Sequence, residues 1–160
     1  MIKKLLSLTL ALAAVLTLAA CRGNEINDAP PLYSVGSVEK LAEAGAFSEE
    51  LEELDGDTAF ALYKLADYGL GREDLKDCAV LRSAGATCEE CAVLVFTSAD
   101  KVETAKEALE AYIQSQIEAN TDYRPAEIPK LESALIDARG ETLLLVVAND
   151  QEVVQQYLDQ

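Results

Sequence analysis

The residues with the widest chemical repertoire in this chain are its four cysteines, Cys21, Cys78, Cys88 and Cys91. Cys88 and Cys91 form a Cys-x-x-Cys pair, the spacing of many thiol–disulfide motifs. The chain has no histidine, which excludes histidine acid–base chemistry and histidine metal ligands. A structural zinc site needs four sulfur or nitrogen ligands. We therefore expect no metal site and no cofactor.

The surroundings of Cys88 and Cys91 leave two readings open. Redox pairs usually place the first cysteine at a helix N-terminus, whereas this pair enters a predicted strand with Glu89 and Glu90 between the sulfurs. These carboxylates should raise the pKa of both thiols. The structural readings are a Cys88–Cys91 disulfide or packed thiols, and the functional alternative is a thiol–disulfide redox accessory protein.

Pairing Cys78 with Cys91 fits the sequence less well. A hairpin that turns near residues 84–89 sets Cys91 opposite about Arg82 and Cys78 opposite about Val95, too far apart for a disulfide. Three cysteines cannot all pair within one chain, so at least one is free or links to another molecule.

Ser98-x-x-Lys101 matches the Ser-x-x-Lys of penicillin-interacting enzymes, but Ser37-x-x-Lys40 matches equally and no Ser-Asp-Asn or Lys-Thr-Gly follows. Helix capping explains Ser98 better. We predict that the protein is not an enzyme and has no catalytic residue.

An acidic cluster and the tyrosines have simple structural readings. The cluster lacks the order of a calcium loop and is interpreted as a solvated helix face. The tyrosines are typical of half-buried core positions with hydrated hydroxyls, although they can also line a ligand groove. The cluster comprises Glu49, Glu50, Glu52, Glu53, Asp55 and Asp57, and the tyrosines are Tyr63, Tyr68, Tyr112, Tyr123 and Tyr157.

The N-terminus reads as a lipoprotein export signal over residues 1–20. Lys3 and Lys4 precede an apolar run from Leu5 to Leu18 that is too short to favour a permanent membrane span. Small residues before Cys21 resemble the lipobox of bacterial lipoproteins, which implies cleavage before Cys21 and its lipidation. We expect a protein anchored through Cys21 in the cell membrane, on its extracytoplasmic face.

Removing residues 1–20 leaves 11 basic against 29 acidic residues, a net charge of −18. Such a body repels nucleic acid and anionic lipid headgroups, so we expect no nucleic-acid partner and membrane contact through the lipid alone. Residues 21–36 contain Pro30 and Pro31, show no periodicity and are interpreted as a flexible tether. Residues 37–160 have the length of one domain.

The domain alternates helical and strand patterns. Residues 37–54 and 58–67 read as helical, 78–82 and 91–97 as a first hairpin, and a helix from Ser98 or Asp100 to Asn120 carries a regular apolar stripe. A short helix at 125–132, a hairpin over 135–148 turning at Gly140, and a helix at 150–158 follow. We predict a single α+β domain with a mainly antiparallel four-stranded sheet of two β-hairpins, in the order α-β-β-α-β-β-α, with helices packed on it.

Three segments resemble the bacterial family catalogued as domain of unknown function 4358, over about residues 58–158. They are SAGATCEECAVLVF at 83–96, TDYRPAEIPKLESA at 121–134 and RGETLLLVV at 139–147, with matching positions Gly85, Ala86, Glu89, Glu90, Tyr123, Pro125 and Gly140. The sequence departs from the family pattern at Cys88 and Cys91. The family consists largely of lipoproteins of Gram-positive bacteria and has no established activity, so the resemblance implies a fold and a cellular location but no catalytic residue. We therefore expect a non-enzymatic module that binds a protein or another component of the cell envelope.

Overall fold

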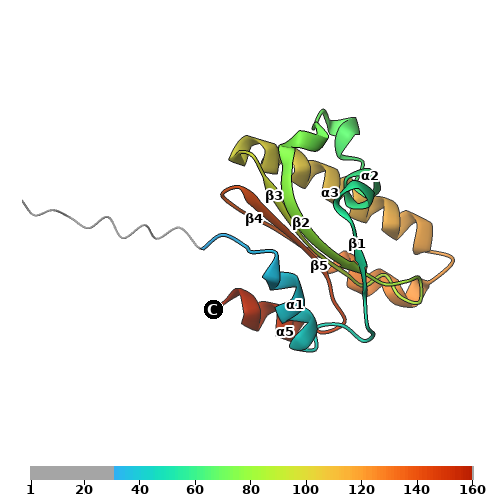
Figure 1. The fold of residues 1–160 in the computed structure, drawn as a ribbon. Coiled ribbons are helices and arrows are strands. Elements are labelled where there is room, and N and C mark those ends of the chain that lie inside the picture. Colours follow the sequence, from blue (N-terminus) through green and yellow to red (C-terminus); the bar gives the residue numbers. More distant parts are fainter. Residues whose placement is uncertain (1–30, 160) are drawn as a thin grey trace, which may run out of the picture.

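The computed structural model describes residues 31–159, and a five-stranded antiparallel sheet in the order β1-β2-β3-β5-β4 forms its centre. The predicted signal segment, Cys21 and most of the predicted tether lie outside the described residues. Helices cover both faces of the sheet (Figure 1), so the single α+β domain predicted from the sequence is confirmed. The strands are β1 (Glu52–Leu54), β2 (Leu75–Arg82), β3 (Glu90–Phe96), β4 (Leu135–Arg139) and β5 (Thr142–Val147).

Strands β3 and β5 lie at the centre of the sheet and pair with each other, Val93 opposite Leu144. Both are apolar at almost every position because helices cover both of their faces. The two predicted hairpins, β2–β3 and β4–β5, are present. Gly140 turns the second with a φ of +56°, a conformation that glycine adopts without steric cost.

The prediction of four strands in the order α-β-β-α-β-β-α is wrong. Strand β1 pairs antiparallel with β2 at the edge of the sheet, Glu53 opposite Leu81. It lies inside the segment predicted to be helical, because Leu51 and Leu54 have the three-residue spacing of a helix. Only three residues long and largely exposed, β1 forms because β2 offers it an open edge, and this partner is not visible in its own sequence.

The helices form two layers. On one face lie α2 (Gly56–Leu62) and α3 (Ala99–Asn120), and on the other α1 (Gly36–Glu43) packs against α5 (Gln151–Leu158) (Figure 1). The short α4 (Ile128–Glu132) packs on α3. Within residues 31–159 there are also three 3-10 turns: η1 (Leu65–Tyr68), η2 (Arg72–Asp74) and η3 (Pro125–Glu127).

The long helix α3 follows its predicted stripe. Ser98 occupies the N-cap position, and the stripe residues Val102, Ala105, Leu109, Tyr112 and Ile113 are buried. Strand alternation completes this core, because Ala92, Leu94 and Phe96 face α3 while Cys91 and Val93 face α1 and α5. The two faces of β3 therefore belong to two separate hydrophobic clusters.

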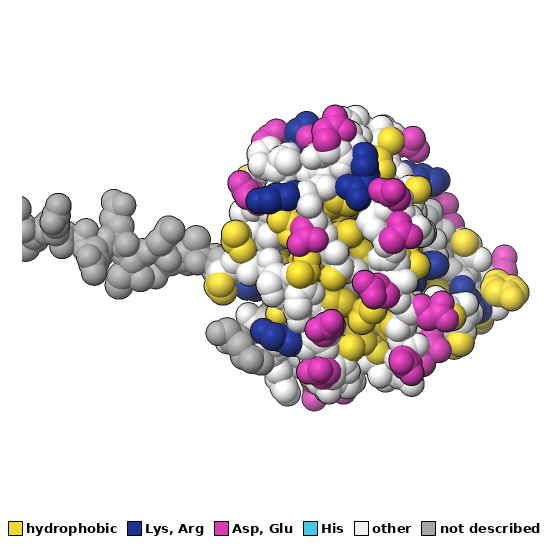
Figure 2. Space-filling model, in the orientation of Figure 1, with side chains coloured by type: hydrophobic (Ala, Val, Ile, Leu, Met, Phe, Trp, Pro, Cys, Tyr) yellow, Lys and Arg dark blue, Asp and Glu magenta, His cyan; other side chains and the backbone are white. Residues whose placement is uncertain are grey.

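Acidic side chains are spread over the visible surface and surround an apolar area between α1 and β1 (Figure 2). That area is a shallow groove lined by Val35, Val38, Ala79 and Leu81, with Glu53 at its rim. Among residues 31–159, no helix has the length and apolar character needed to cross a membrane.

Candidate functional site

The connection between β2 and β3 is fixed by polar contacts from two other parts of the chain. Gly85 adopts a φ of +122°, and Nη1 of Arg124 donates to its carbonyl at 2.8 Å. Hydroxyls of Ser83 and Thr87 donate to Oε1 of Glu49. These bonds hold the start of β3, where two consecutive glutamates are buried, in a single position.

Glu90 is a buried carboxylate with three donors. Tyr63 donates to Oε1 at 2.5 Å, Tyr112 to Oε2 at 2.7 Å, and Nε of Arg82 to Oε2 at 3.1 Å. The two tyrosine rings meet edge to face, with centroids 5.2 Å apart. Because a buried carboxylate is costly without partners, this set of bonds holds both rings in place.

Burial raises the pKa of Glu90 above its ordinary value, although the hydrogen bonds from Tyr63 and Tyr112 and the charge of Arg82 oppose the rise. The same burial raises the pKa of both tyrosines, whose hydroxyls therefore stay protonated donors at neutral pH.

The raised pKa of Glu90 predicts a pH dependence of stability. Between the pKa of the unfolded chain, near 4.5, and the higher native value, the native state binds more protons than the unfolded state, so this group's contribution falls as pH rises through that window. Glu90→Gln removes the titration. Urea titration gives the free energy of unfolding of the native protein and of Glu90→Gln. The difference, native minus variant, should therefore be largest at low pH and decrease above pH 4.5. A difference that increases with pH would contradict the assignment.

Glu89 is also fully buried but joins a different set of partners. The backbone N–H and hydroxyl of Ser48 donate to its two oxygens at 2.7 and 2.5 Å, and Nζ of Lys130 donates at 2.7 Å. Lys130 also pairs with Glu127 at 3.2 Å. Glu89 therefore ties the segment after α1 and the helix α4 to the beginning of β3.

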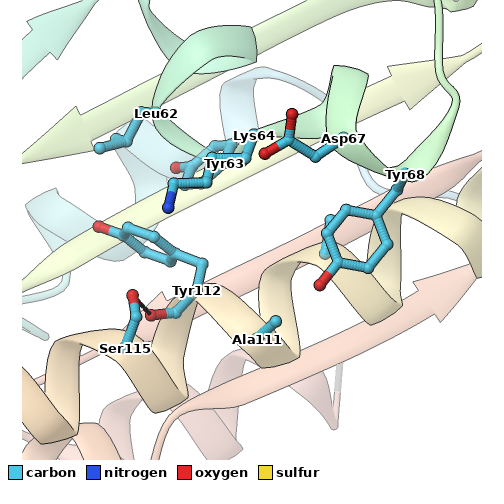
Figure 3. Close-up of a pocket in the computed structure, with 9 residues that line it drawn as sticks. Leu62, Tyr63, Lys64, Asp67, Tyr68, Ala111, Tyr112 and Ser115 are labelled. Atoms are coloured by element: carbon cyan, nitrogen blue, oxygen red, sulfur yellow. Dashed lines mark hydrogen bonds between the residues drawn. The ribbon is translucent and has the colours of Figure 1, made fainter.

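A pocket of about 360 Å³ opens beside the Glu90 cluster, between η1 and α3 (Figure 3). Tyr63 and Tyr112 form its inner wall, and Tyr68 stands at the far end. On α3 it is lined by the small residues Ala108, Ala111 and Ser115, which leave the space open. Leu62 and two charged side chains, Lys64 and Asp67, complete the lining.

Lys64 holds an unusual backbone conformation at the mouth of this pocket. Among the described residues it is the one non-glycine residue with positive φ, +52°, and it follows the C-cap of α2, where glycine is the usual choice. A lysine there costs about 1 kcal/mol relative to glycine. Such strain is retained where the side chain serves a purpose.

The strain predicts that Lys64→Gly stabilises the protein by about 0.5–1 kcal/mol, because glycine adopts this conformation without the clash of a Cβ atom. Urea unfolding would measure the gain. Lys106→Gly, in the middle of α3, is the control and should destabilise by about 1 kcal/mol. Equal destabilisation by both variants would show that Lys64 is not strained.

The structure does not bring the candidate redox cysteines together. Cys78, Cys88 and Cys91 are all free thiols. Cys88 packs against the cluster under α3, whereas Cys91 points to the opposite face, toward α1 and α5. Cys91 lies opposite Leu81 and Cys78 opposite Leu94, one residue from the predicted register.

Burial is the main reason that the pKa of each of these thiols is raised. Glu90 adds to the effect at Cys91, as the sequence suggested, but at Cys88 the charge of Arg124 lowers the pKa more than that of Glu127 raises it. At Cys78 the charge of Arg72 opposes the rise. None of the three thiols is therefore activated as a nucleophile.

We predict slow alkylation of all three thiols in the native protein at neutral pH. Iodoacetamide should modify the half-buried Cys78 and Cys88 more slowly than a free thiol, and the fully buried Cys91 only after unfolding in urea. Mass spectrometry of the digested protein identifies each site. Rapid native labelling of Cys88 or Cys91 would revive a redox role.

The other sequence candidates have structural roles. Ser98 occupies the N-cap position of α3, although its side chain makes no capping hydrogen bond, and Lys101 pairs with Asp74 at 3.4 Å. The acidic cluster is not a helix face: Glu52 and Glu53 lie in β1, and Asp55 accepts hydrogen bonds from the first residues of α2. Among the described residues, no group of cysteine or acidic side chains is arranged to hold a metal ion.

The sequence reasoning kept a groove lined by tyrosines as an alternative, and Tyr63, Tyr68 and Tyr112 do line the pocket, but it missed the buried Glu89–Glu90 pair. It predicted hydrated tyrosine hydroxyls, whereas Tyr63 and Tyr112 donate to a buried carboxylate. The available signal was the position of Glu90 in β3, where alternation places it on the same face as Ala92, Leu94 and Phe96. A glutamate at such a position needs donors from the helices that cover that face.

The comparison with known proteins gives one match. A family model described as domain of unknown function (DUF4358) matches residues 49–148, which contain both buried glutamates and every residue of the pocket. No curated protein and no solved structure matches the chain. Because the match spans 100 of the 160 residues, the chain belongs to the DUF4358 family.

Proposed function

We propose that this protein is a non-enzymatic binding module, anchored by lipid on the extracytoplasmic face of a bacterial cell membrane. The pocket between η1 and α3 is its recognition site. The observation that carries the binding role is the construction of this pocket: its inner wall, Tyr63 and Tyr112, is fixed on buried Glu90, while Lys64 and Asp67 stay exposed at the opening. Rigid aromatic walls with a few placed polar groups are typical of binding sites.

The chemistry of the site supports binding more than catalysis. Glu90 is saturated by three donors and shielded by the tyrosine rings, so it is not placed to exchange a proton with a bound molecule. The raised thiol pKa values and the separation of Cys88 from Cys91 leave the thiol–disulfide alternative without comparable support.

The anchoring part of the proposal rests on the lipobox-like residues before Cys21. Cys21→Ser should release the protein from the membrane fraction, and the native protein, but not the variant, should carry the added mass of the acyl chains. Cys88→Ser serves as the control and should remain in the membrane. Release of neither variant would contradict lipid anchoring.

The binding part calls for a crosslinking experiment in membranes. A photo-reactive phenylalanine analogue at Tyr68, which lines the pocket, should capture an envelope protein or another envelope component. The same analogue at Tyr123, which is 80% exposed and does not line the pocket, is the matched control. Identical products at both positions, or none at Tyr68, would contradict recognition of an envelope partner through this pocket.

A further inference from the structure

We infer that the pocket between η1 and α3 takes a small zwitterion, a molecule with a carboxylate and an ammonium group such as an amino acid or a dipeptide. This inference rests on the proposed binding function and specifies its ligand. It follows from two opposite charges that share the pocket, from the net charge of the protein, and from the size and walls of the cavity.

Lys64 and Asp67 line the same pocket from one short segment, yet they do not pair with each other. The structure shows no ion pair or side-chain hydrogen bond for either among the described residues. Figure 3 shows the Lys64 amine extended toward the Tyr112 side of the pocket and the Asp67 carboxylate directed into the same space. A ligand with both charges can meet the two at once.

The structure gives Lys64 no ion pair, as it gives none for Lys40, Lys76 and Lys106 among the described residues. Lys64 differs from these three because it lines the pocket. It also keeps a strained backbone and offers its charge to the pocket. Lys64 can therefore pair with an anionic group of a ligand in the pocket.

The charge of the whole molecule limits which anion can arrive. The formal net charge of −16 creates a field that repels a ligand with net negative charge. A zwitterion carries no net charge, so this field does not exclude it, and its ammonium group finds Asp67. A purely cationic ligand would meet the field favourably but would face Lys64.

The size and walls of the pocket fit a small molecule. Its volume of about 360 Å³ is near the lower end of the range for ligand sites. The rings of Tyr68 and Tyr112 and the methyl group of Ala111 offer apolar contact to a ligand side chain. Since Tyr63 and Tyr112 are already fixed by Glu90, the inner wall does not need to be ordered on binding.

The test uses the full-length protein in detergent and measures its unfolding temperature with the standard L-amino acids and their glycyl dipeptides as probes. At least one probe should raise the unfolding temperature at millimolar concentration. The N-acetyl derivative of that probe lacks the ammonium group, and its amide lacks the carboxylate. Each should bind about tenfold or more weakly in calorimetry. The affinity for the amino acid relative to that for the dipeptide shows whether the pocket prefers a free amino acid or the end of a peptide.

Two variants assign the charges. Lys64→Gln should lower the affinity for the unmodified probe to that for its amide, and the affinity for the amide should not change. Asp67→Asn should lower the affinity for the unmodified probe to that for its N-acetyl derivative, and the affinity for the N-acetyl derivative should not change. Lys106→Gln and Asp122→Asn, which lie outside the pocket lining, should have no effect. The inference is overturned by blocked derivatives that bind equally well, by variants without effect, or by a panel in which no probe binds.

These outcomes are distinct from those of the crosslinking experiment. Capture of a partner at Tyr68 together with a silent amino-acid panel would leave the proposed function standing and refute the zwitterion. Binding of an amino acid without any crosslinked partner would support the zwitterion and refute recognition of a large envelope component. Failure of both would refute both.

Discussion

Replacing Glu90 by alanine is expected to lower the free energy of unfolding by about 3–5 kcal/mol, the typical effect of removing one partner from a buried charged cluster. The variant leaves the hydroxyls of Tyr63 and Tyr112 without an acceptor in the core and removes the partner of Arg82. Since a domain of this kind is stable by only about 5–15 kcal/mol, the loss should be plain in urea unfolding followed by circular dichroism.

A triple variant separates the cost of unpaired groups from the net value of the cluster. In Glu90→Leu/Tyr63→Phe/Tyr112→Phe all three polar partners become apolar together, and Arg82, whose side chain is 35% exposed, can turn to solvent. Replacing both sides of a buried hydrogen bond is nearly neutral in favourable cases, so the triple variant should recover most of the stability lost in Glu90→Ala.

The control for this comparison is Tyr63→Phe alone, which leaves Glu90 with the donors Tyr112 and Arg82 and should cost about 1–2 kcal/mol. A triple variant no more stable than Glu90→Ala would show that the cluster contributes net stability. If Glu90→Ala cost less than about 1 kcal/mol, the network would not be holding the inner wall of the pocket, and the structural basis for its rigidity would be lost.

The sequence was informative wherever one segment carried its own pattern. The stripe of α3, the apolar runs of β3 and β5 and the turn at Gly140 all follow from local chemistry, and each was predicted close to its observed position. The apolar residues of these elements can be buried by any helix or strand that packs on them, so the identity of the packing partner is not needed to predict them.

The sequence was uninformative where a residue's role depends on a distant partner. Strand β1 exists because β2 has a free edge, and Glu90 is tolerated because Tyr63 and Tyr112 reach it from two separate elements. The pocket has the same origin, since Lys64 and Ala111 are brought together only by the packing of η1 on α3. Such features depend on long-range pairing, which no local pattern records.

The second large effect is expected at Glu89 and Lys130. Glu89→Ala should cost about 2–4 kcal/mol, because it leaves the Lys130 ammonium, whose side chain is 18% exposed, with Glu127 alone and frees both donors of Ser48. Although burial lowers the pKa of Lys130, bonding to Glu89 and Glu127 raises it above its ordinary value overall. Lys130 therefore keeps its charge throughout the neutral range.

A double-mutant cycle isolates this pair. Lys130→Met leaves Glu89 buried with the Ser48 donors alone, and the sum of the two single losses should exceed the loss in Glu89→Ala/Lys130→Met by about 1–3 kcal/mol. The matched control is Lys101→Met, which breaks the more exposed pair with Asp74 and should cost less than about 1 kcal/mol.

The location of the effect is as informative as its size. Because Glu89 ties the segment after α1 and the helix α4 to one end of β3, Lys130→Met should speed hydrogen exchange in α4 and leave the hairpin β4–β5 unchanged. The inner wall of the pocket is held by Glu90 and not by Glu89, so any ligand affinity at Lys64 and Asp67 should also stay the same. Two results would contradict these separate roles of Glu89 and Glu90. One is an equal loss of unfolding free energy in Lys130→Met and Lys101→Met, and the other is weakened ligand binding in Lys130→Met.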